Sequence, residues 1–201
     1  MEVCMNARND LLLDKLELRA PLPSDGHQLN QLVAASPPLD TNSVYCNLLQ
    51  CLHFADTSVA AVLDGRLVGF ISAYCPPNEP ETLFVWQVVV AEPVRGSGLA
   101  KRMLHWLIQQ PGTEQALGLA TTITPNNRAS WALFESFAQD CDALPVKSVL
   151  FQRDRHFAGQ HDDEYLLRIA PLPNRPDKSM VNHVDDLRSS LRTPGSRRWL
   201  D

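Results

Sequence analysis

A short turn between an apolar run and an amphipathic segment carries residue types that suit phosphate binding. In "VVVAEPVRGSGLAKRML", the turn places Gly96 and Gly98 on either side of Ser97, directly after Arg95. Glycines let backbone N–H groups approach a ligand closely, and the start of a helix attracts an anion. A P-loop is excluded because no Gly-Lys-Ser/Thr follows, and a dinucleotide-binding turn would need a third glycine. Two interpretations remain open: a phosphate or pyrophosphate site, and a plain glycine turn.

A second stretch, "GQHDDEY", offers acid–base chemistry. His161 and Glu164 lie three residues apart, at the beginning of an apolar segment. A histidine suits the role of general base because it titrates near neutral pH, and a glutamate suits the role of a clamp for an ammonium group. The alternative is a solvated loop, and Asp162 and Asp163 are expected to face the solvent.

Three further side chains could take part in such a site. Trp86 could face an ammonium group through a cation–π contact, or could be a core aromatic. Asp40 precedes a predicted helix, where a carboxylate also favours the helix dipole. Glu92 is either a base or a surface acid, and the second interpretation is preferred.

The cysteines and the other histidines predict neither a metal site nor a thiol nucleophile. The chain has five cysteines, an odd number, and no C-x-x-C pair. We therefore expect reduced thiols, as in a cytosolic protein. Cys46 and Cys51 have no local basic partner that would activate them, and no histidine, aspartate and cysteine cluster has the spacing of metal ligands.

Composition narrows the class of protein further. The 201 residues suffice for one domain with a proper core, and 44% hydrophobic with 20% charged residues fits a globular chain. A net charge of −5 argues against nucleic-acid binding. No stretch resembles a signal peptide, and the longest apolar run, Leu83–Ala91, is too short to span a bilayer, so a cytoplasmic location is expected.

The elements that must position these residues follow from hydrophobic periodicity and turn signals. Residues 1–15 are expected to form a flexible arm, 16–171 the folded domain, and 172–201 a disordered tail. Ser24 is a predicted helix cap, and the Asp64-Gly65 pair predicts a hairpin. The predicted strands are 16–21, both arms of the hairpin in 58–74, 82–91, 116–124, 146–152 and 164–171. The predicted helices are 24–35, one that follows Thr41 or Asn42 and carries apolar residues from Val44 to Leu52, 99–110 and 128–139. This order indicates a mixed α/β fold with antiparallel meanders.

The strand, turn and helix around Arg95 together resemble the GNAT superfamily of acetyl-CoA-dependent N-acetyltransferases. Their motif R/Q-x-x-G-x-G/A matches Arg95–Ala100, and a second motif matches Asn127-x-x-Ser130-x-x-Leu133-Phe134. The resemblance implies a GNAT fold, a twisted and mainly antiparallel sheet with splayed central strands. It implies that Val88 and Val90 pair with the pantetheine arm of acetyl-CoA. The remaining cofactor residues that it implies are Arg95, Gly96, Ser97, Gly98, Leu99, Ala100 and Asn127.

Within the superfamily, segments from Leu16 to Ile169 resemble the diaminobutyrate acetyltransferases of ectoine biosynthesis. These segments include "LDTNSVYCNLLQCLHFADTSVAAV", "TTITPNNRASWALF" and "HDDEYLLRI". The resemblance implies acetylation of L-2,4-diaminobutyrate to N4-acetyl-L-2,4-diaminobutyrate by a homodimer. The substrate pocket that it implies contains Asp40, Tyr45, Trp86, His161 and Glu164, and Glu164, His161 and Tyr45 are the expected catalytic residues.

The acetylation of such a substrate requires a group that deprotonates the amine and a group that protonates the thiolate, and neither is settled by the sequence. A free amine titrates at about 10, and only its neutral form attacks a thioester, so a base or a water relay is needed beside carboxylates that hold the α-ammonium group. Many superfamily members have a tyrosine that protonates the thiolate at the position of Phe134, which has no proton to give. The alternatives are a GNAT enzyme for another small amine, polyamine, aminoglycoside or protein N-terminus, and a non-catalytic acetyl-CoA sensor.

Overall fold

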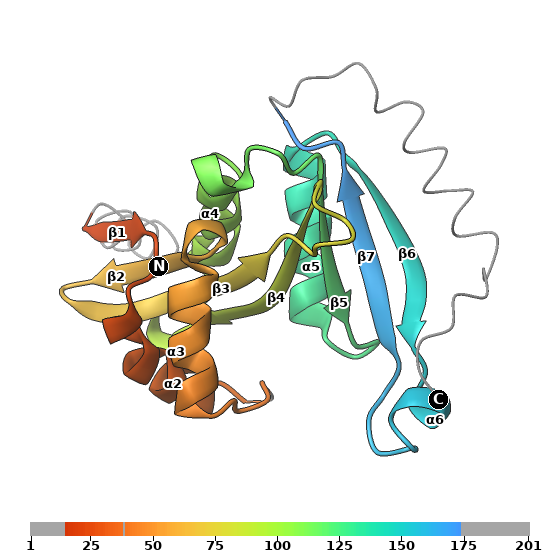
Figure 1. The fold of residues 1–201 in the computed structure, drawn as a ribbon, viewed down its shortest axis with the longest axis horizontal. Coiled ribbons are helices and arrows are strands. Elements are labelled where there is room, and N and C mark those ends of the chain that lie inside the picture. The colour runs from red at the N-terminus through yellow and green to blue at the C-terminus, as the bar shows by residue number, and fades with distance from the viewer. Residues whose placement is uncertain (1–14, 38, 174–201) are drawn as a thin grey trace, which may run out of the picture.

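The computed structural model describes residues 15–37 and 39–173. Seven strands form one sheet in the order β1-β2-β3-β4-β5-β7-β6 (Figure 1). The strands are β1 (Leu16–Arg19), β2 (Val59–Leu63), β3 (Arg66–Tyr74), β4 (Thr82–Val90), β5 (Gly118–Ile123), β6 (Leu144–Phe151) and β7 (Glu164–Ala170). The α-helices are α2 (Gly26–Ala34), α3 (Val44–His53), α4 (Leu99–Leu107), α5 (Arg128–Asp140) and α6 (Arg153–His156). The predicted mixed α/β class is confirmed, whereas residues 1–14 of the predicted arm and 174–201 of the predicted tail lie outside the described residues.

Local sequence explains the hairpin of β2 and β3. Asp64 and Gly65 both have positive φ angles, 48° and 76°, as the short turn between two twisted antiparallel strands requires. The strands pair from Val59 opposite Ile71 to Leu63 opposite Arg66. The predicted Asp-Gly hairpin is therefore confirmed.

Strand β4 lies at the centre of the sheet, as its apolar sequence predicts, and it pairs with its two neighbouring strands over different lengths. It pairs with β3 along its length, ending with Val90 opposite Gly69. With β5 it pairs in parallel only from Thr82 to Val85. Figure 1 shows β4 and β5 running in different directions beyond this short region. The end of β4 thus splays away from β5, as the family resemblance implies.

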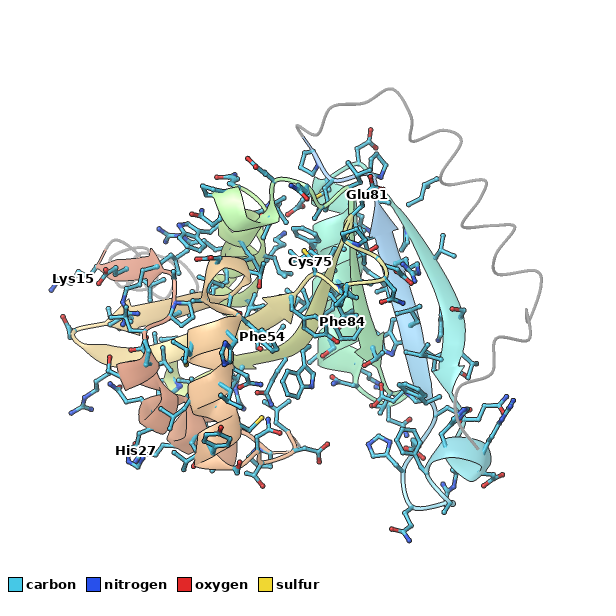
Figure 2. The ribbon with its side chains drawn as sticks, viewed as in Figure 1. Lys15, His27, Phe54, Cys75, Glu81 and Phe84 are labelled. Atoms are coloured by element: carbon cyan, nitrogen blue, oxygen red, sulfur yellow. The ribbon has the colours of Figure 1, made fainter. Side chains whose placement is uncertain are left out.

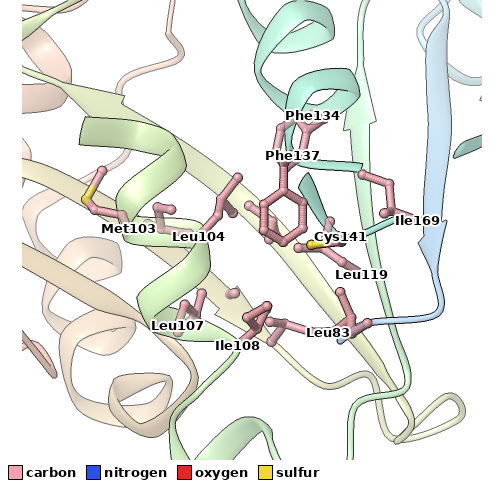
Figure 3. Packing of buried hydrophobic residues seen from close by; sticks show 14 of the residues in the cluster. Leu83, Met103, Leu104, Leu107, Ile108, Leu119, Phe134, Phe137, Cys141 and Ile169 are labelled. Carbon is pink, nitrogen blue, oxygen red and sulfur yellow. The ribbon is translucent and has the colours of Figure 1, made fainter. Parts of the chain in front are cut away.

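Helices cover the two faces of the sheet and create two hydrophobic clusters. One cluster joins α4 and α5 to inward side chains of β4, β5 and β7, and includes Leu104, Phe137 and Ile169 (Figure 3). The second cluster joins α2 and α3 to the opposite face, where Phe70 and Val89 are buried. The sheet is therefore covered on both faces over β2 to β4, the part that also carries the turn with Arg95.

Helix α3 departs from ordinary amphipathicity. Ser43 caps it, with its Oγ accepting a hydrogen bond from Cys46 N at 3.1 Å. The helix buries the polar side chains of Asn47 and Gln50, although the apolar residues have helical spacing. Its apolar side chains Val44, Tyr45, Leu48 and Leu52 are exposed. The helix was predicted correctly, but its apolar pattern does not mark the face that packs on the sheet.

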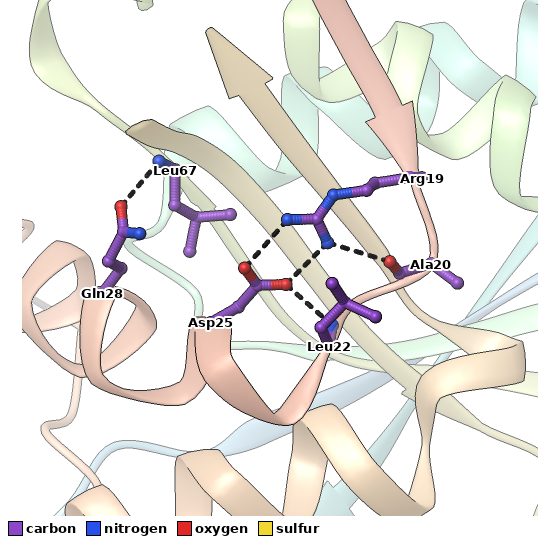
Figure 4. Close-up of polar contacts among 6 residues, drawn as sticks. All are labelled: Arg19, Ala20, Leu22, Asp25, Gln28 and Leu67. Carbon is purple, nitrogen blue, oxygen red and sulfur yellow. Dashed lines mark hydrogen bonds and ion pairs between the residues drawn. The ribbon is translucent and has the colours of Figure 1, made fainter. Parts of the chain in front are cut away.

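The beginning of the domain is held by a charged pair rather than by the predicted Ser24 cap. Ser24 lies in a short 3-10 turn, Pro23–Asp25, that precedes α2. Figure 4 shows the Asp25 carboxylate accepting two hydrogen bonds from Arg19, at 2.7 and 2.9 Å, and one from Leu22 N at 2.7 Å. Gln28 reaches in turn to Leu67 N on β3. These contacts connect the start of α2 to the edge strand β1 and to the inner strand β3.

Removal of the Asp25 charge is expected to destabilise the fold in a pH-dependent way. Burial alone would raise the pKa of Asp25, but the hydrogen bonds from Arg19 and Leu22 outweigh it and hold this pKa below its ordinary value. The stabilisation is therefore present above the unfolded-state pKa and is lost as the pH falls through the folded-state pKa. Asp25→Asn is expected to cost about 3 kcal/mol at neutral pH, the lower part of the range for breaking a buried pair.

Urea unfolding of Asp25→Asn and the parent protein between pH 3 and 7 checks this expectation. The difference between the two free energies of unfolding is expected to shrink below about pH 4, where the aspartate of the unfolded parent becomes protonated, and to go on shrinking as the pH approaches the lower folded-state pKa. A difference that stays constant over the whole range would contradict a role for the charge.

Candidate active site

The splayed end of β4 directs backbone groups of two residues away from β3. Ala91 N donates to Val68 O at 2.8 Å, so Ala91 and Val68 form a hydrogen-bonded pair. Hydrogen-bonded pairs alternate along an antiparallel ladder. With Val88 opposite Ile71 and Val90 opposite Gly69, the N–H and C=O groups of Val88 and Val90 must face the side that β5 has left. These are the two residues that the sequence predicts to pair with pantetheine.

The turn after β4 forms an open cradle of backbone amides. Gly96 and Gly98 have φ angles of 77° and 80°, and no atom lies within 4 Å of the position that a Cβ would occupy at either residue. Gly98 precedes α4, and no side chain caps the helix there. The first N–H groups of α4 therefore need an external acceptor, which the helix dipole favours as an anion. The predicted strand, turn and helix arrangement is confirmed, and its geometry fits a phosphate group.

Side chains of the turn bond to the protein rather than projecting freely. Arg95 Nε donates to Val90 O at 3.0 Å, and Arg95 Nη2 donates to Ser36 Oγ at 3.1 Å. Ser97 Oγ donates to Val94 O at 2.7 Å. The carbonyl of Val90 is therefore already satisfied, which leaves its N–H and both backbone groups of Val88 on the open side of β4.

The second family motif lies at the start of α5. Asn127 caps this helix, with its Oδ1 accepting from Ser130 N at 3.1 Å, so its Nδ2 remains the group that could contact a ligand. Phe134 is only 2% exposed and packs in the cluster of Figure 3. Phe134 therefore acts as a core residue.

An acidic cluster lies where β4 and β5 separate. Val85 and Thr121 are the last paired residues of these strands, and the next residue of β5, Thr122, donates a side-chain hydrogen bond to Glu164. Burial raises the pKa of Glu164, and the charge of Asp40 raises it further, against opposing effects of His161 and Thr122. The loop before α3 thus supplies Asp40, the loop before β7 supplies His161, and the first residue of β7 is Glu164, with which both interact electrostatically.

Aromatic side chains line the neighbouring surface of β3, β4 and α3. Phe54 stacks on Tyr74 with ring centroids 5.2 Å apart, and it meets Trp86 edge-on at 6.4 Å. Figure 2 shows Phe54 and Phe84 near the centre of the molecule. Trp86 is 44% exposed, which fits the wall of a site better than a core residue. Tyr45 is 69% exposed on the first turn of α3 and remains a predicted pocket residue.

The remaining acids that the sequence offered are placed at the surface. Glu92 is exposed at the start of a 3-10 turn. Asp162 is exposed, and its Oδ1 lies 3.4 Å from Arg153 Nη1. The carboxylate of Asp163 accepts a hydrogen bond from Arg153 N at 2.6 Å. His161 is partly buried, with its ring 4.7 Å from that of Phe157. The preferred interpretation of Glu92 as a surface acid agrees with this placement.

Three buried polar atoms near this surface went unnoticed in the sequence. Gln50 Nε2, Ser72 Oγ and Gln87 Oε1 lack a hydrogen-bond partner among the described residues. Ser72 lies directly opposite Gln87 in the β3–β4 ladder. Both share the face of Phe70 and Val89, which α2 and α3 cover. The only signal in the sequence was a glutamine inside an apolar strand.

Substitution of Ser72 distinguishes a structural hydroxyl from one that binds a ligand. Because this hydroxyl is fully buried and unpartnered, Ser72→Ala is expected to raise the free energy of unfolding by about 1 kcal/mol. The corresponding rise in Tm, measured by calorimetry, is about 2–4 °C for a chain of this size. A lower Tm, or a loss of affinity for the amine that the family resemblance implies as substrate, would contradict this expectation.

The amide cradle and the cluster of carboxylates with Trp86 lie on opposite faces of the sheet and meet at the gap between β4 and β5. The amide cradle belongs to α4, which packs beside Val88 and Val90. The carboxylates and Trp86 belong to the face of α3, because Trp86 contacts Phe54 and Glu164 interacts electrostatically with Asp40 in the loop before α3. The cradle suits an anionic ligand, and the carboxylates with Trp86 suit a cationic one. The site can therefore bring an anionic donor and a cationic acceptor together.

Comparisons with known proteins agree with this geometry. Residues 27–138 match the acetyltransferase (GNAT) family. The chain is 49% identical to the L-2,4-diaminobutyric acid acetyltransferase of Methylotuvimicrobium alcaliphilum over 157 residues, 78% of this chain and 91% of that protein. It is 44% identical to the same enzyme of Chromohalobacter salexigens over 158 residues, 78% of this chain and 82% of that protein.

A solved structure is also similar. It is the diaminobutyrate acetyltransferase of Paenibacillus lautus in complex with L-2,4-diaminobutyric acid and coenzyme A, which has a TM-score of 0.76 and 37% identity over 81% of this chain and 98% of that chain. The predicted fold, with its splayed central strands, is confirmed by this similarity.

Proposed function

The chain belongs to the L-2,4-diaminobutyric acid acetyltransferases of the GNAT family, and from this premise we propose how its site acts. The enzyme transfers the acetyl group of acetyl-CoA to the γ-amine of L-2,4-diaminobutyrate, and its product is N4-acetyl-L-2,4-diaminobutyrate. We place this reaction in ectoine biosynthesis, in the cytoplasm. The free thiols of Cys46, Cys51, Cys75 and Cys141 fit that reducing compartment.

One observation carries the proposal: the amide cradle and the carboxylate cluster converge on one gap in the sheet. The residues present fit acetyl-CoA, since the turn of Gly96 and Gly98 leaves room for its pyrophosphate and the unpaired side of β4 suits its pantetheine arm. Coenzyme A supplies the acetyl group as a thioester. Glu164, which is partly buried, and Asp40, which is exposed, give the acceptor face two negative charges, which a diamine compensates.

Glu164 is the proposed general base. A carboxylate whose pKa is raised by burial accepts a proton from the γ-ammonium group more readily than an ordinary glutamate does. The neutral amine then attacks the acetyl carbonyl, whose oxygen a backbone N–H of β4 polarises. A C–N bond forms and the C–S bond breaks, and the second proton of the nitrogen passes to the leaving thiolate through water.

The remaining predicted pocket residues hold the substrate. His161 moderates the charge of Glu164, Asp40 attracts the α-ammonium group, and Trp86 offers its ring to a cation. Tyr45 is proposed to close the pocket from α3. The leaving thiolate is protonated without help from Phe134, which is buried in the core.

The decisive experiment combines purified protein, acetyl-CoA and L-2,4-diaminobutyrate. Thiol release is followed with a thiol reagent, and NMR then locates the acetyl group on the product. Rapid release with acetylation at N4 is the expected result. Faster turnover of a polyamine or a peptide would show that the substrate is another amine of the GNAT family. Binding of acetyl-CoA without thiol release in the presence of any amine would support a non-catalytic sensor.

We propose further that the enzyme is a homodimer that pairs through β6. This strand is at the edge of the described sheet and exposes Leu144, Val149, Leu150 and Phe151. An open edge with apolar side chains favours pairing with another chain. Leu150→Lys is therefore expected to convert a dimer to a monomer in analytical ultracentrifugation.

A matched substitution on α3 serves as the control for the dimer. Leu52 is 55% exposed on the other apolar surface, and Leu52→Lys is expected to leave the dimer intact. Dissociation by Leu52→Lys alone would move the interface to α3. A monomeric parent protein would exclude the homodimer.

A further inference from the structure

The guanidinium group of Arg95 makes hydrogen bonds within the protein that a side chain serving only to bind phosphate would not need. Its Nε holds the carbonyl of Val90 at 3.0 Å, at the end of the cofactor strand. Its Nη2 holds Ser36 Oγ at 3.1 Å, on the segment that follows α2. Fifty-nine positions separate Arg95 and Ser36 in the chain. One planar guanidinium group therefore joins two parts of the molecule that the sheet otherwise keeps on different faces.

Ser36 begins the loop that carries Asp40. Ser36, whose hydroxyl group accepts the hydrogen bond from Arg95, is only 3% exposed. Its backbone carbonyl accepts a second hydrogen bond from Leu39 N at 3.1 Å. The far end of the same loop is held by Asn30, whose Nδ2 donates to Asn42 O at 2.8 Å. The substrate loop, whose described residues are 36–37 and 39–43, is thus held by Arg95 at Ser36 and by Asn30 of α2 at Asn42.

Arg95 is covalently part of the turn that receives the anion. Gly96 and Gly98, which follow it within three residues, have no close neighbours at their Cβ positions, so the backbone of these two glycines has room to adjust, although Ser97 bonds to Val94 O. An anion bound by the backbone amides would restrict it and with it the base of the Arg95 side chain. The hydrogen bond to Ser36 transmits that restriction to the loop with Asp40.

We propose that Arg95 is a positioning residue that couples the binding of coenzyme A to the binding of the amine substrate. The proposal rests on the function proposed above. When coenzyme A orders the turn, Arg95 holds the substrate loop, and with it Asp40, in the geometry that receives the amine. Coupling between two ligands is reciprocal, so the amine also strengthens the binding of coenzyme A by the same factor.

Calorimetric titration measures the coupling directly. L-2,4-diaminobutyrate is titrated into the protein with and without saturating coenzyme A, which replaces acetyl-CoA so that no turnover occurs. The parent protein is expected to bind the amine about 5- to 100-fold more tightly with coenzyme A present, the usual range of coupling between sites. In Ser36→Ala and Arg95→Gln this ratio is expected to fall to about 1–3.

Ser97→Ala provides a matched control. It also deletes one hydroxyl group from a hydrogen bond near the turn, but Ser97 bonds to Val94 within the turn itself. This variant is expected to weaken coenzyme A binding and to keep the coupling ratio of the parent. Circular dichroism and Tm confirm that each variant is folded, and steady-state kinetics is expected to show a raised KM for the amine in Ser36→Ala with kcat little changed.

The outcomes separate the possible failures. A parent ratio of 1, or a parental ratio in Ser36→Ala, would overturn the coupling. Loss of coenzyme A affinity in Arg95→Gln with an unchanged ratio would make Arg95 a phosphate ligand instead. Failure of the amine to bind under any condition would contradict the proposed substrate rather than the role of Arg95.

Discussion

Glu164→Gln is expected to lower kcat/KM for L-2,4-diaminobutyrate by about 10²- to 10⁴-fold, the usual contribution of a general base. Glutamine keeps the size of the side chain and can still accept a hydrogen bond from Thr122, but it cannot take a proton from the amine. Steady-state thiol release measures the effect. Asp162→Asn removes a neighbouring carboxylate that is exposed at the surface, and this control is expected to retain parental activity.

The raised pKa of Glu164 gives the same variant a second readout. The parent kcat/KM is expected to rise with pH through this pKa, and the acid limb should be absent in Glu164→Gln. The contribution of Glu164 to the free energy of unfolding changes with pH in the opposite direction to that of Asp25. A carboxyl group with a raised folded-state pKa binds more protons when folded, so the free energy of unfolding falls as the pH rises between the two pKa values.

Glu164→Gln removes this electrostatic cost. The variant is therefore expected to unfold at a higher Tm than the parent at neutral pH while it loses activity. Such a trade between stability and activity is common at functional sites. Near-parental activity of Glu164→Gln would assign the base to His161 or to water.

Gly98→Ala is expected to raise the KM for acetyl-CoA by about 10- to 100-fold, which corresponds to the loss of one hydrogen bond to a charged group. Gly98 has a φ of 80°, a conformation that an L side chain adopts with strain. No protein atom lies near the position of the new Cβ, so the methyl group would project into the space that we assign to the pyrophosphate. Initial rates at varied acetyl-CoA measure the change.

Gly65 offers a matched control for the backbone strain. It has a φ of 76° and likewise no atom within 4 Å of a Cβ, but it lies in the β2–β3 turn. Both alanine variants are expected to lose about 1 kcal/mol of unfolding free energy. Only Gly98→Ala should change the KM for acetyl-CoA. An equal effect of Gly65→Ala on this KM would show that strain and not the cradle is responsible.

The sequence by itself determined the features that depend on neighbouring residues. The Asp64-Gly65 turn, the buried strand β4 and the glycine turn before α4 each follow from local backbone preferences. Motifs of five to ten residues sufficed to identify the family, because a phosphate cradle is built from consecutive amides. Glu164 and Asp40 were also assigned to one substrate pocket from the sequence, but only through the family resemblance and not through any local pattern.

Only the tertiary structure decided which side chains meet across the sheet. Helical spacing alone marked the apolar residues of α3, yet the helix buries Asn47 and Gln50 and exposes Tyr45 and Leu52. The bond of Arg95 to Ser36 joins distant residues, and the raised pKa of Glu164 depends on burial and on Asp40. Burial, charge interactions and long-range hydrogen bonds depend on how the strands and loops pack in three dimensions, which no local pattern of residues encodes.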